Sequence, residues 1–225
     1  MDKDPVVIVT GASRGLGAAV TRWLAKVGAA IILIARSGDK LADVAADVRR
    51  LGGKPLVCEA DVSDYDACRA AVKNTLTQFG RIDSLVNNAG ILQPISSIAR
   101  TDPASWQYNI EVNLIGPFNL SRAAVADLRK QKGRIVNVSS GAANLALETV
   151  SAYCASKAAL RMAGMALAIV ATLLAKDPKL RYPSAHALRD DLRRFRNGEQ
   201  VQALVAAAAR PGTPAAGMAR PGTAA

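Results

Sequence analysis

Residues 6–17 read Val-Val-Ile-Val-Thr-Gly-Ala-Ser-Arg-Gly-Leu-Gly, and the predicted architecture is built outward from them. The first four residues are a β-branched run of the kind that forms a buried parallel strand. The glycines follow at once, and apolar residues then recur at helical spacing from Ala18 to Val27. The local order is therefore a strand, a glycine-rich turn and a helix.

This glycine-rich turn is a candidate phosphate site. Glycines let backbone N–H groups approach a pyrophosphate, and the helix that follows offers the positive end of its dipole to the same anion. The spacing is Gly-x-x-x-Gly-x-Gly, which differs from the commoner Gly-x-Gly-x-x-Gly. We predict a nucleotide site here that includes Thr10, Gly11, Ser13, Arg14, Gly15, Leu16 and Gly17.

Strand and helix patterns alternate through the following residues. Further strands are predicted at residues 31–34, 56–58, 84–86 and 135–138, and helices at residues 39–51, 64–79 and 103–129, the last interrupted near Gly116-Pro117. This alternation is typical of an α/β protein with a doubly wound parallel sheet, a Rossmann fold, with right-handed crossovers. Ligands of such sheets bind at the carboxyl ends of the strands. Gly11, Asp61, Asn87 and Ser140 all fall at such ends.

Arg36 lies just past the second strand, where the adenosine ribose of a dinucleotide would rest. An acidic residue near this point takes the ribose 2′-hydroxyl of NAD, whereas an arginine suits a 2′-phosphate. Arg14 could join it, so NADP (NADPH) is preferred over NAD. The alternative is that Arg36 is an ordinary solvated residue. At the end of the third strand, Asp61 and Val62 form a turn whose carboxylate could accept a hydrogen bond from the adenine amine.

Residues 140–157 carry a second chemical pattern. Tyr153 and Lys157 are four residues apart, so one helix would present both on the same face. A phenol is a poor acid at neutral pH, and an adjacent ammonium favours its ionised form. Ser140 could hold a carbonyl oxygen while Tyr153 gives or takes the proton, a role typically worth about 10²–10⁴ in rate. Tyr-x-x-x-Lys also arises by chance, so its meaning depends on the other motifs.

Together these motifs resemble the short-chain dehydrogenase/reductase family over residues 5–165. The matching pieces are Thr10-Gly11-x-x-x-Gly15-x-Gly17, Asp61, Asn87-Asn88-Ala89-Gly90, Asn113 and a serine thirteen residues before Tyr-x-x-x-Lys. The resemblance implies an NAD(P)-dependent enzyme in which Ser140 orients a substrate carbonyl and Tyr153 is the acid/base. It also implies that Lys157 holds the nicotinamide ribose, that Asn113 supports a proton-relay water, and that Asn87, Ala89 and Gly90 belong to the cofactor site.

Within that family, the sequences around Ser140 and Tyr153 are most similar to the sepiapterin reductase and benzil reductase group of carbonyl reductases. This narrower resemblance implies an NADPH-dependent reductase of a small-molecule carbonyl substrate. Family members pack the catalytic helix on a neighbouring subunit, which implies a homodimer or homotetramer. The rival prediction is an NADP-binding module without catalysis, or a non-functional fusion product.

The chain departs from the family pattern after Leu160, where no sixth strand can be read. We therefore expect a sheet truncated after the fifth strand, a long helix from about Ser151 into the 170s, and a helical tail of foreign character over residues 166–205. Residues 173–200 resemble a C-terminal fragment of bacterial serine/threonine protein kinases, without the motifs that kinase activity requires. Residues 206–225 are rich in Pro, Gly and Ala, and this composition predicts disorder.

Composition narrows the classes of partner. Aromatic residues are only 4% of the chain, which argues against a nucleic-acid binder that stacks bases. The net charge is +11, and Arg189, Arg193, Arg194 and Arg196 add to it, but a solvated helix face explains them. The three cysteines lack metal-ligand spacing, so no metal is expected, and their odd count points to the reducing cytoplasm. The apolar run 162–175 falls short of the ~20 residues that span a bilayer.

Overall fold

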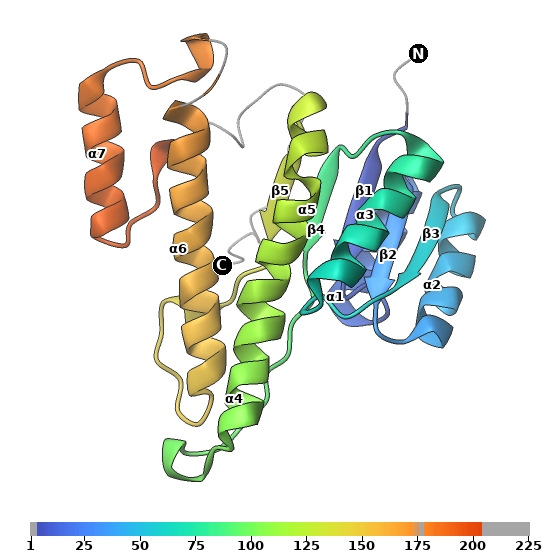
Figure 1. The fold of residues 1–225 in the computed structure, drawn as a ribbon, viewed down its shortest axis with the longest axis horizontal. Helices are drawn as coiled ribbons and strands as arrows, with labels where there is room; N and C mark the ends of the chain where they lie inside the picture. Colours follow the sequence, from blue (N-terminus) through green and yellow to red (C-terminus); the bar gives the residue numbers. More distant parts are fainter. Residues whose placement is uncertain (1–3, 174, 176–177, 204–225) are drawn as a thin grey trace, which may run out of the picture. The chain divides into compact units, whose positions relative to one another are not determined.

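The computed structural model describes residues 4–173, 175 and 178–203 of the 225-residue chain (Figure 1). The chain divides into two compact units, Met1–Arg161 and Met162–Ala225, which we call unit 1 and unit 2. Helix α6, Ser151–Leu173, begins in the first and ends in the second, as the sequence predicted for a long helix from about Ser151. The predicted disordered end, residues 206–225, lies outside the described residues.

Unit 1 is built on a parallel sheet of five strands in the order β3-β2-β1-β4-β5. The strands are β1 Val6–Thr10, β2 Ala30–Ala35, β3 Lys54–Glu59, β4 Ser84–Asn87 and β5 Arg134–Asn137. The chain runs outward from β1 to β3 and then returns to the other side of β1, where β4 and β5 follow (Figure 1). This reversal confirms the predicted doubly wound Rossmann-type sheet.

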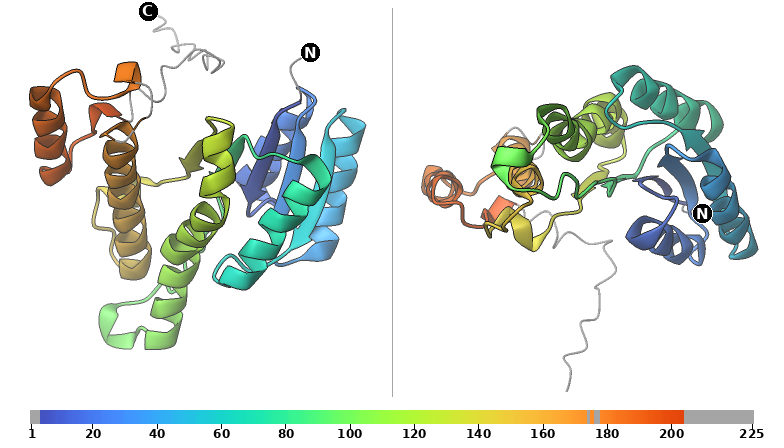
Figure 2. Two further views of the ribbon diagram at one scale, coloured as in Figure 1. Left: turned by 45° about the horizontal axis from the view of Figure 1, so that its top comes forward. Right: turned by 90° about the horizontal axis from the view of Figure 1, so that it is seen from below.

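Helices cover both faces of this sheet (Figure 2). They are α1 Gly15–Ala25, α2 Gly38–Arg50, α3 Tyr65–Phe79, α4 Pro103–Ile110 and α5 Gly116–Lys130. Successive side chains of a strand point to opposite faces, so Val7 and Val9 pack with α1 and α2, while Val6 and Ile8 belong to the core under α3 and α5. All five residues of β1 are buried, which explains its continuous apolar run.

The predicted helix over residues 103–129 is divided by a π-helical segment and not by a break at Gly116-Pro117. Between α4 and α5 the chain forms a π-helical segment, Glu111–Ile115, and the helical path continues through Gly116 and Pro117. Pro117 is tolerated because it occupies the first turn of α5. A side chain on Gly116 would press on Val62, so this glycine permits close packing of α5 against the end of β3. The π-helical segment places Asn113 at its centre.

Unit 2 combines the end of α6 with a short 3-10 turn, Pro178–Leu180, and helix α7, Ala185–Arg196. Its apolar core contains Met165, Ile169, Val201 and Ala203, with partly buried side chains packed around them. None of the helices in the described part of the chain is both long and apolar enough to cross a membrane.

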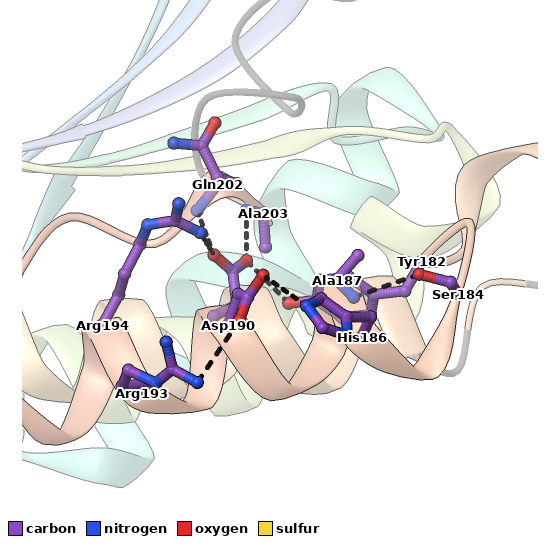
Figure 3. Close-up of polar contacts among 10 residues, drawn as sticks. Tyr182, Ser184, His186, Ala187, Asp190, Arg193, Arg194, Gln202 and Ala203 are labelled. Atoms are coloured by element: carbon purple, nitrogen blue, oxygen red, sulfur yellow. Dashed lines mark hydrogen bonds and ion pairs between the residues drawn. The ribbon is translucent and has the colours of Figure 1, made fainter.

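A buried carboxylate, Asp191, organises the polar contacts of unit 2. Figure 3 labels its hydrogen-bonding partners Tyr182, Arg194, Gln202 and Ala203. Its side chain is 0% exposed and accepts hydrogen bonds from the backbone N–H groups of Gln202 (2.6 Å) and Ala203 (2.8 Å). Tyr182 donates its hydroxyl to the same group at 2.9 Å, and Arg194 donates Nη1 at 3.2 Å. Burial alone would raise the pKa of Asp191, but these hydrogen bonds outweigh it and hold the pKa below its ordinary value.

We predict that Asp191→Ala opens unit 2 while unit 1 stays folded. The substitution leaves the N–H groups of Gln202 and Ala203 without their acceptor, and each such loss costs about 1–3 kcal/mol. Hydrogen exchange at residues 182–203 should accelerate accordingly, with exchange in β1 and β2 unchanged. Asp190→Ala is the matched control, because Asp190 is partly exposed and lies 3.8 Å from Arg193. Equal effects of the two substitutions would contradict this role.

The same carboxylate predicts the direction of a pH dependence. Because the pKa of Asp191 is lower in the folded chain than the unfolded value of about 3.9, its stabilising contribution is present above that pH. The contribution is lost as the pH falls through the folded pKa. Protection of residues 182–203 from exchange should therefore decline below about pH 4 in the wild type. In Asp191→Ala this decline should be weaker.

Candidate functional site

The predicted site residues all lie in unit 1, at one edge of the sheet. Thr10 and Asn87 end β1 and β4, and Arg36 directly follows β2. Asp61 and Ser140 lie two and three residues beyond the ends of β3 and β5. Because parallel strands end at the same edge, residues that are far apart in the sequence gather there.

The glycine-rich turn between β1 and α1 requires its glycines for two different reasons. Gly11 and Gly15 have φ values of +63° and +56°, which disfavour other residues. Gly17 is buried, and a Cβ atom there would overlap the Gly11 carbonyl oxygen and the Asn88 amide. A Cβ at Gly15 would meet nothing within 4 Å, so the turn is open at the first residue of α1. Such a cradle fits a phosphate group at a helix N-terminus.

The segment after β4 holds this turn in place. Thr10 Oγ1 accepts hydrogen bonds from the backbone N–H groups of Asn88 (3.0 Å) and Ala89 (2.9 Å), and Asn88 Nδ2 donates to the Thr10 carbonyl at 2.9 Å. The Asn87 side chain instead donates to Asn137 at 2.9 Å and ties β4 to β5. Asn88 belongs to the quoted sequence motif but was not predicted as a site residue, and the structure gives it the central part of this clamp.

The residues next to the turn differ in exposure. Ser13 is partly buried, whereas Arg14 and Leu16 are exposed on either side of Gly15. The Arg14 carbonyl accepts from the Ala18 N–H at 3.3 Å, whereas its side chain forms no hydrogen bond or ion pair with any residue that the structure describes. Val62 is buried, and its carbonyl accepts a hydrogen bond from Asn119 at 3.0 Å. Leu16 and Arg14 are therefore accessible to a ligand at the turn, while the Val62 side chain packs in the core.

Asn113 joins the sheet edge to α6 through a buried network. Its Oδ1 accepts from the Ile91 N–H at 2.8 Å, and its Nδ2 donates to the Ile91 carbonyl at 2.8 Å. Nδ2 also lies 2.8 Å from Asn109 Oδ1 and 3.1 Å from Ser156 Oγ. Ser156 in turn donates to the Tyr153 carbonyl at 2.8 Å. Sequence reasoning missed Asn109 and Ser156, although Asn109 precedes Asn113 by one helical turn.

Tyr153 and Lys157 lie on one face of α6, as their spacing predicted. Lys157 is only 4% exposed, its Nζ donates to the Val138 carbonyl at 2.9 Å, and Nζ lies 5.7 Å from the centroid of the Tyr153 ring. Burial lowers the pKa of Lys157. A Cβ on Gly90 would lie 3.7 Å from Nζ, so the segment after β4 also reaches this point.

Ser140 follows β5 and begins a short 3-10 turn, Gly141–Ala143. Its hydroxyl oxygen accepts a hydrogen bond from the Ala142 N–H at 3.2 Å. No hydrogen bond joins Ser140 to Tyr153 within the residues that the structure describes. The structure thus brings Tyr153, Lys157 and the Asn113 network together, while Ser140 is engaged by its own turn.

Arg36 and Asp61 meet at the opposite end of the site through Tyr108 of α4. Tyr108 donates its hydroxyl to Asp61 Oδ2 at 2.9 Å and accepts from Arg36 Nη1 at 2.6 Å. The Ser63 N–H donates to Asp61 Oδ1 at 2.9 Å. Burial would raise the pKa of Asp61, but the hydrogen bonds from Ser63 and Tyr108 and the charge of Arg36 lower it overall. No sequence motif marked Tyr108.

Comparison with known sequences adds a family match. Residues 5–172 match the short chain dehydrogenase family, seven residues beyond the predicted end of the resemblance. The protein "11-beta-hydroxysteroid dehydrogenase-like 3" of Arabidopsis thaliana is 40% identical over 156 residues, which cover 69% of this chain and 50% of that protein. The chain spans about half the length of the curated relatives it matches.

Solved structures with a fold similar to that of this chain differ from one another in their bound cofactor. A metagenomic short-chain oxidoreductase in complex with NADP is 38% identical with a TM-score of 0.71, and the match covers 74% of this chain and 76% of that one. Carveol dehydrogenase from Mycobacterium avium in complex with NAD is 28% identical with a TM-score of 0.71, covering 74% and 65%.

We predict that Gly17→Ala weakens dinucleotide binding. The added methyl group would push α1 away from the Gly11 carbonyl and from the Asn88 amide, and so open the phosphate cradle. Titration with a nicotinamide dinucleotide should show affinity reduced at least about tenfold. Gly28→Ala is the control, because Gly28 has a φ of +78° and a Cβ there comes no closer than 3.7 Å to a neighbour. It should cost about 1–2 kcal/mol of stability and leave binding intact.

Proposed function

Because the chain belongs to the short-chain dehydrogenase family, we propose that it is an NADPH-dependent carbonyl reductase that moves hydride between a nicotinamide cofactor and a small ketone or alcohol. The observation that supports this most directly is the buried ammonium of Lys157 beside the ring of Tyr153. A relative and the solved structures carry dehydrogenase or oxidoreductase names, which favours the same reaction class for this chain.

The residues present fit a dinucleotide. The turn from Gly11 to Gly17 is open at Gly15, where a pyrophosphate would accept hydrogen bonds from backbone N–H groups. Asp61 would accept from the adenine amine, and Arg36 and Arg14 would hold a ribose 2′-phosphate. Lys157 would donate to the nicotinamide ribose. Bound there, the nicotinamide supplies or accepts the hydride, and the protein supplies position and charge.

Tyr153 moves the proton in this proposal. Its phenol would protonate the carbonyl oxygen as the alcohol forms and would take the proton back in the reverse direction. The Lys157 ammonium is held near the Tyr153 ring by the Val138 carbonyl, so a positive charge would lie close to the phenol during the proton transfer. Ser140 would orient the carbonyl oxygen by turning its hydroxyl hydrogen toward it, because its oxygen already accepts from Ala142.

Asn113 has a positioning role in the same proposal. Its amide is fully engaged by Ile91, Asn109 and Ser156, so it would support a relay water by fixing the surrounding backbone. A π-helical segment leaves backbone groups outside the regular helical pattern, and such segments are frequent at functional sites. The Ser156 link transmits this position to the turn of α6 that carries Tyr153.

The narrower parts of the proposal have separate support. The preference for NADP rests on Arg36, since related structures hold either NADP or NAD. The carbonyl substrate rests on the resemblance to sepiapterin and benzil reductases. The rival proposal is an NADP-binding module without turnover. Assembly as a homodimer or homotetramer and a cytoplasmic location stay predictions from the sequence.

Tyr153→Phe should abolish diketone reduction while leaving NADPH binding nearly intact. The substitution removes the proton donor and retains the ring that faces Lys157. Turnover and cofactor fluorescence should be measured on the same preparation. A variant that keeps most of its rate would remove this mechanism. Wild-type binding without any turnover would favour the rival module.

Arg36→Asp should reverse the cofactor preference. A charge-assisted contact of Arg36 with a 2′-phosphate is worth roughly 1.5–3 kcal/mol, so NADPH affinity should fall at least about tenfold. NADH affinity should stay equal or improve, because the new carboxylate can accept from a 2′-hydroxyl. Arg50→Asp on α2 is a charge-matched control, since Arg50 pairs with Asp47 away from the strand ends. Unchanged discrimination in Arg36→Asp would show that Arg36 is a surface residue only.

A further inference from the structure

The hydroxyl of Tyr108 lies between the guanidinium of Arg36 and the carboxylate of Asp61. Arg36 follows β2, Asp61 follows β3, and Tyr108 comes from α4, 72 and 47 residues away from them. The Tyr108 ring packs partly buried against the core under α3 and α5. The ring is therefore held by apolar contacts, and only the hydroxyl reaches the charged pair.

The direction of both hydrogen bonds is set by the chemistry of the partners. A carboxylate can only accept, so the Tyr108 hydroxyl donates its hydrogen bond to Asp61 Oδ2. A guanidinium can only donate, so Arg36 Nη1 donates a hydrogen bond to the Tyr108 hydroxyl oxygen. Burial, followed by the hydrogen bond and charge of Asp61, raises the pKa of Tyr108. The hydroxyl consequently stays protonated and uncharged near neutral pH.

Removing the Tyr108 hydroxyl would change the orientation of the Arg36 side chain. Its Nη1 already lies 3.9 Å from Asp61 Oδ2, and the Arg36 side chain is 60% exposed. Without the intervening oxygen, the shortest rearrangement is direct closure of this ion pair. Closure would turn the guanidinium inward and commit one carboxylate oxygen to it. Tyr108 therefore keeps Arg36 directed outward, with its other N–H groups available to a ligand.

We propose that Tyr108 is a positioning residue that determines cofactor specificity, because it preorganises Arg36 for an adenosine ribose that carries a 2′-phosphate. The inference rests on the proposed NADPH-dependent function and adds a residue that no motif marks. A neutral hydroxyl is suited to this task, since it fixes one edge of the guanidinium without cancelling its charge. Preorganisation raises affinity by reducing the side-chain entropy lost on binding.

The test uses fragments of the cofactor, so that it does not depend on turnover. Binding of 2′,5′-ADP and of 5′-AMP to the full chain should be measured by calorimetry for the wild type and Tyr108→Phe. The variant should weaken 2′,5′-ADP about five- to tenfold and 5′-AMP less than about twofold. Tyr65→Phe is the matched control, because Tyr65 lies on α3 against Arg69 and should change neither affinity. Thermal unfolding should show that Tyr108→Phe stays folded, since the packed ring is retained.

A double-mutant cycle separates positioning from general packing. In an Arg36→Ala background, Tyr108→Phe should cause no further loss of 2′,5′-ADP affinity, because the residue acts through Arg36. Additive losses would overturn the inference, as would an unchanged ratio of the two affinities in Tyr108→Phe. If the wild type prefers 2′,5′-ADP and Tyr108→Phe keeps the same preference, the role of Tyr108 is overturned and the proposed NADP preference stands. A wild type that binds both fragments equally contradicts the proposed NADP preference and overturns the inference with it.

Discussion

The close approach of α1 to the end of β1 sets the geometry of the glycine-rich turn. Gly17 packs against the Gly11 carbonyl with no room for a side chain, and Asn88 and Thr10 hydrogen-bond across the same contact. This contact directs the start of α1 at the open side of the turn. The strand order reverses between β1 and β4, so the segment after β4 lies beside the glycine-rich turn. The shape of the proposed phosphate cradle is thus a consequence of backbone packing and sheet topology together.

The end of the candidate site that carries Tyr153 and Lys157 is positioned by a different kind of contact. Buried amides and one serine link the π-helical segment at Asn113 to α6, and a single backbone carbonyl, that of Val138, holds the ammonium of Lys157. Each of these groups is buried or nearly so, and a buried polar group is costly unless it is paired. The same pairing that stabilises the fold therefore fixes where Tyr153 and Lys157 lie. Tyr108 extends this principle to the other end of the candidate site, where its hydroxyl connects Arg36 and Asp61.

Sequence reasoning predicted what depends on local patterns and missed what depends on long-range polar contacts. The five strands and the helical pair of Tyr153 and Lys157 follow from periodicity, and the turn follows from glycine spacing. Tyr108 could not be found this way, because its partners are 47 and 72 residues distant and no periodicity encodes which polar side chains meet. The interruption that the sequence predicts near Gly116-Pro117 differs from the structure, in which the helical path continues through both residues and the irregular part is the π-helical segment Glu111–Ile115. The family match ends at residue 172, so the kinase resemblance of residues 173–200 stays a prediction.

The backbone N–H and carbonyl of Val138 have a consequence for the order in which the chain folds. Its N–H donates to the Asn87 carbonyl at 2.9 Å, and its carbonyl accepts from Lys157. Asn87 and the neighbouring Asn137 are 50 residues apart, so the docking of β5 on β4 closes a long loop, which makes it an entropically slow step. Lys157 cannot be buried with its partner until that step is complete. The glycine-rich turn depends on a distant contact as well, because Thr10 and Asn88 are 78 residues apart, so both ends of the candidate site are complete only after β4 has joined the sheet.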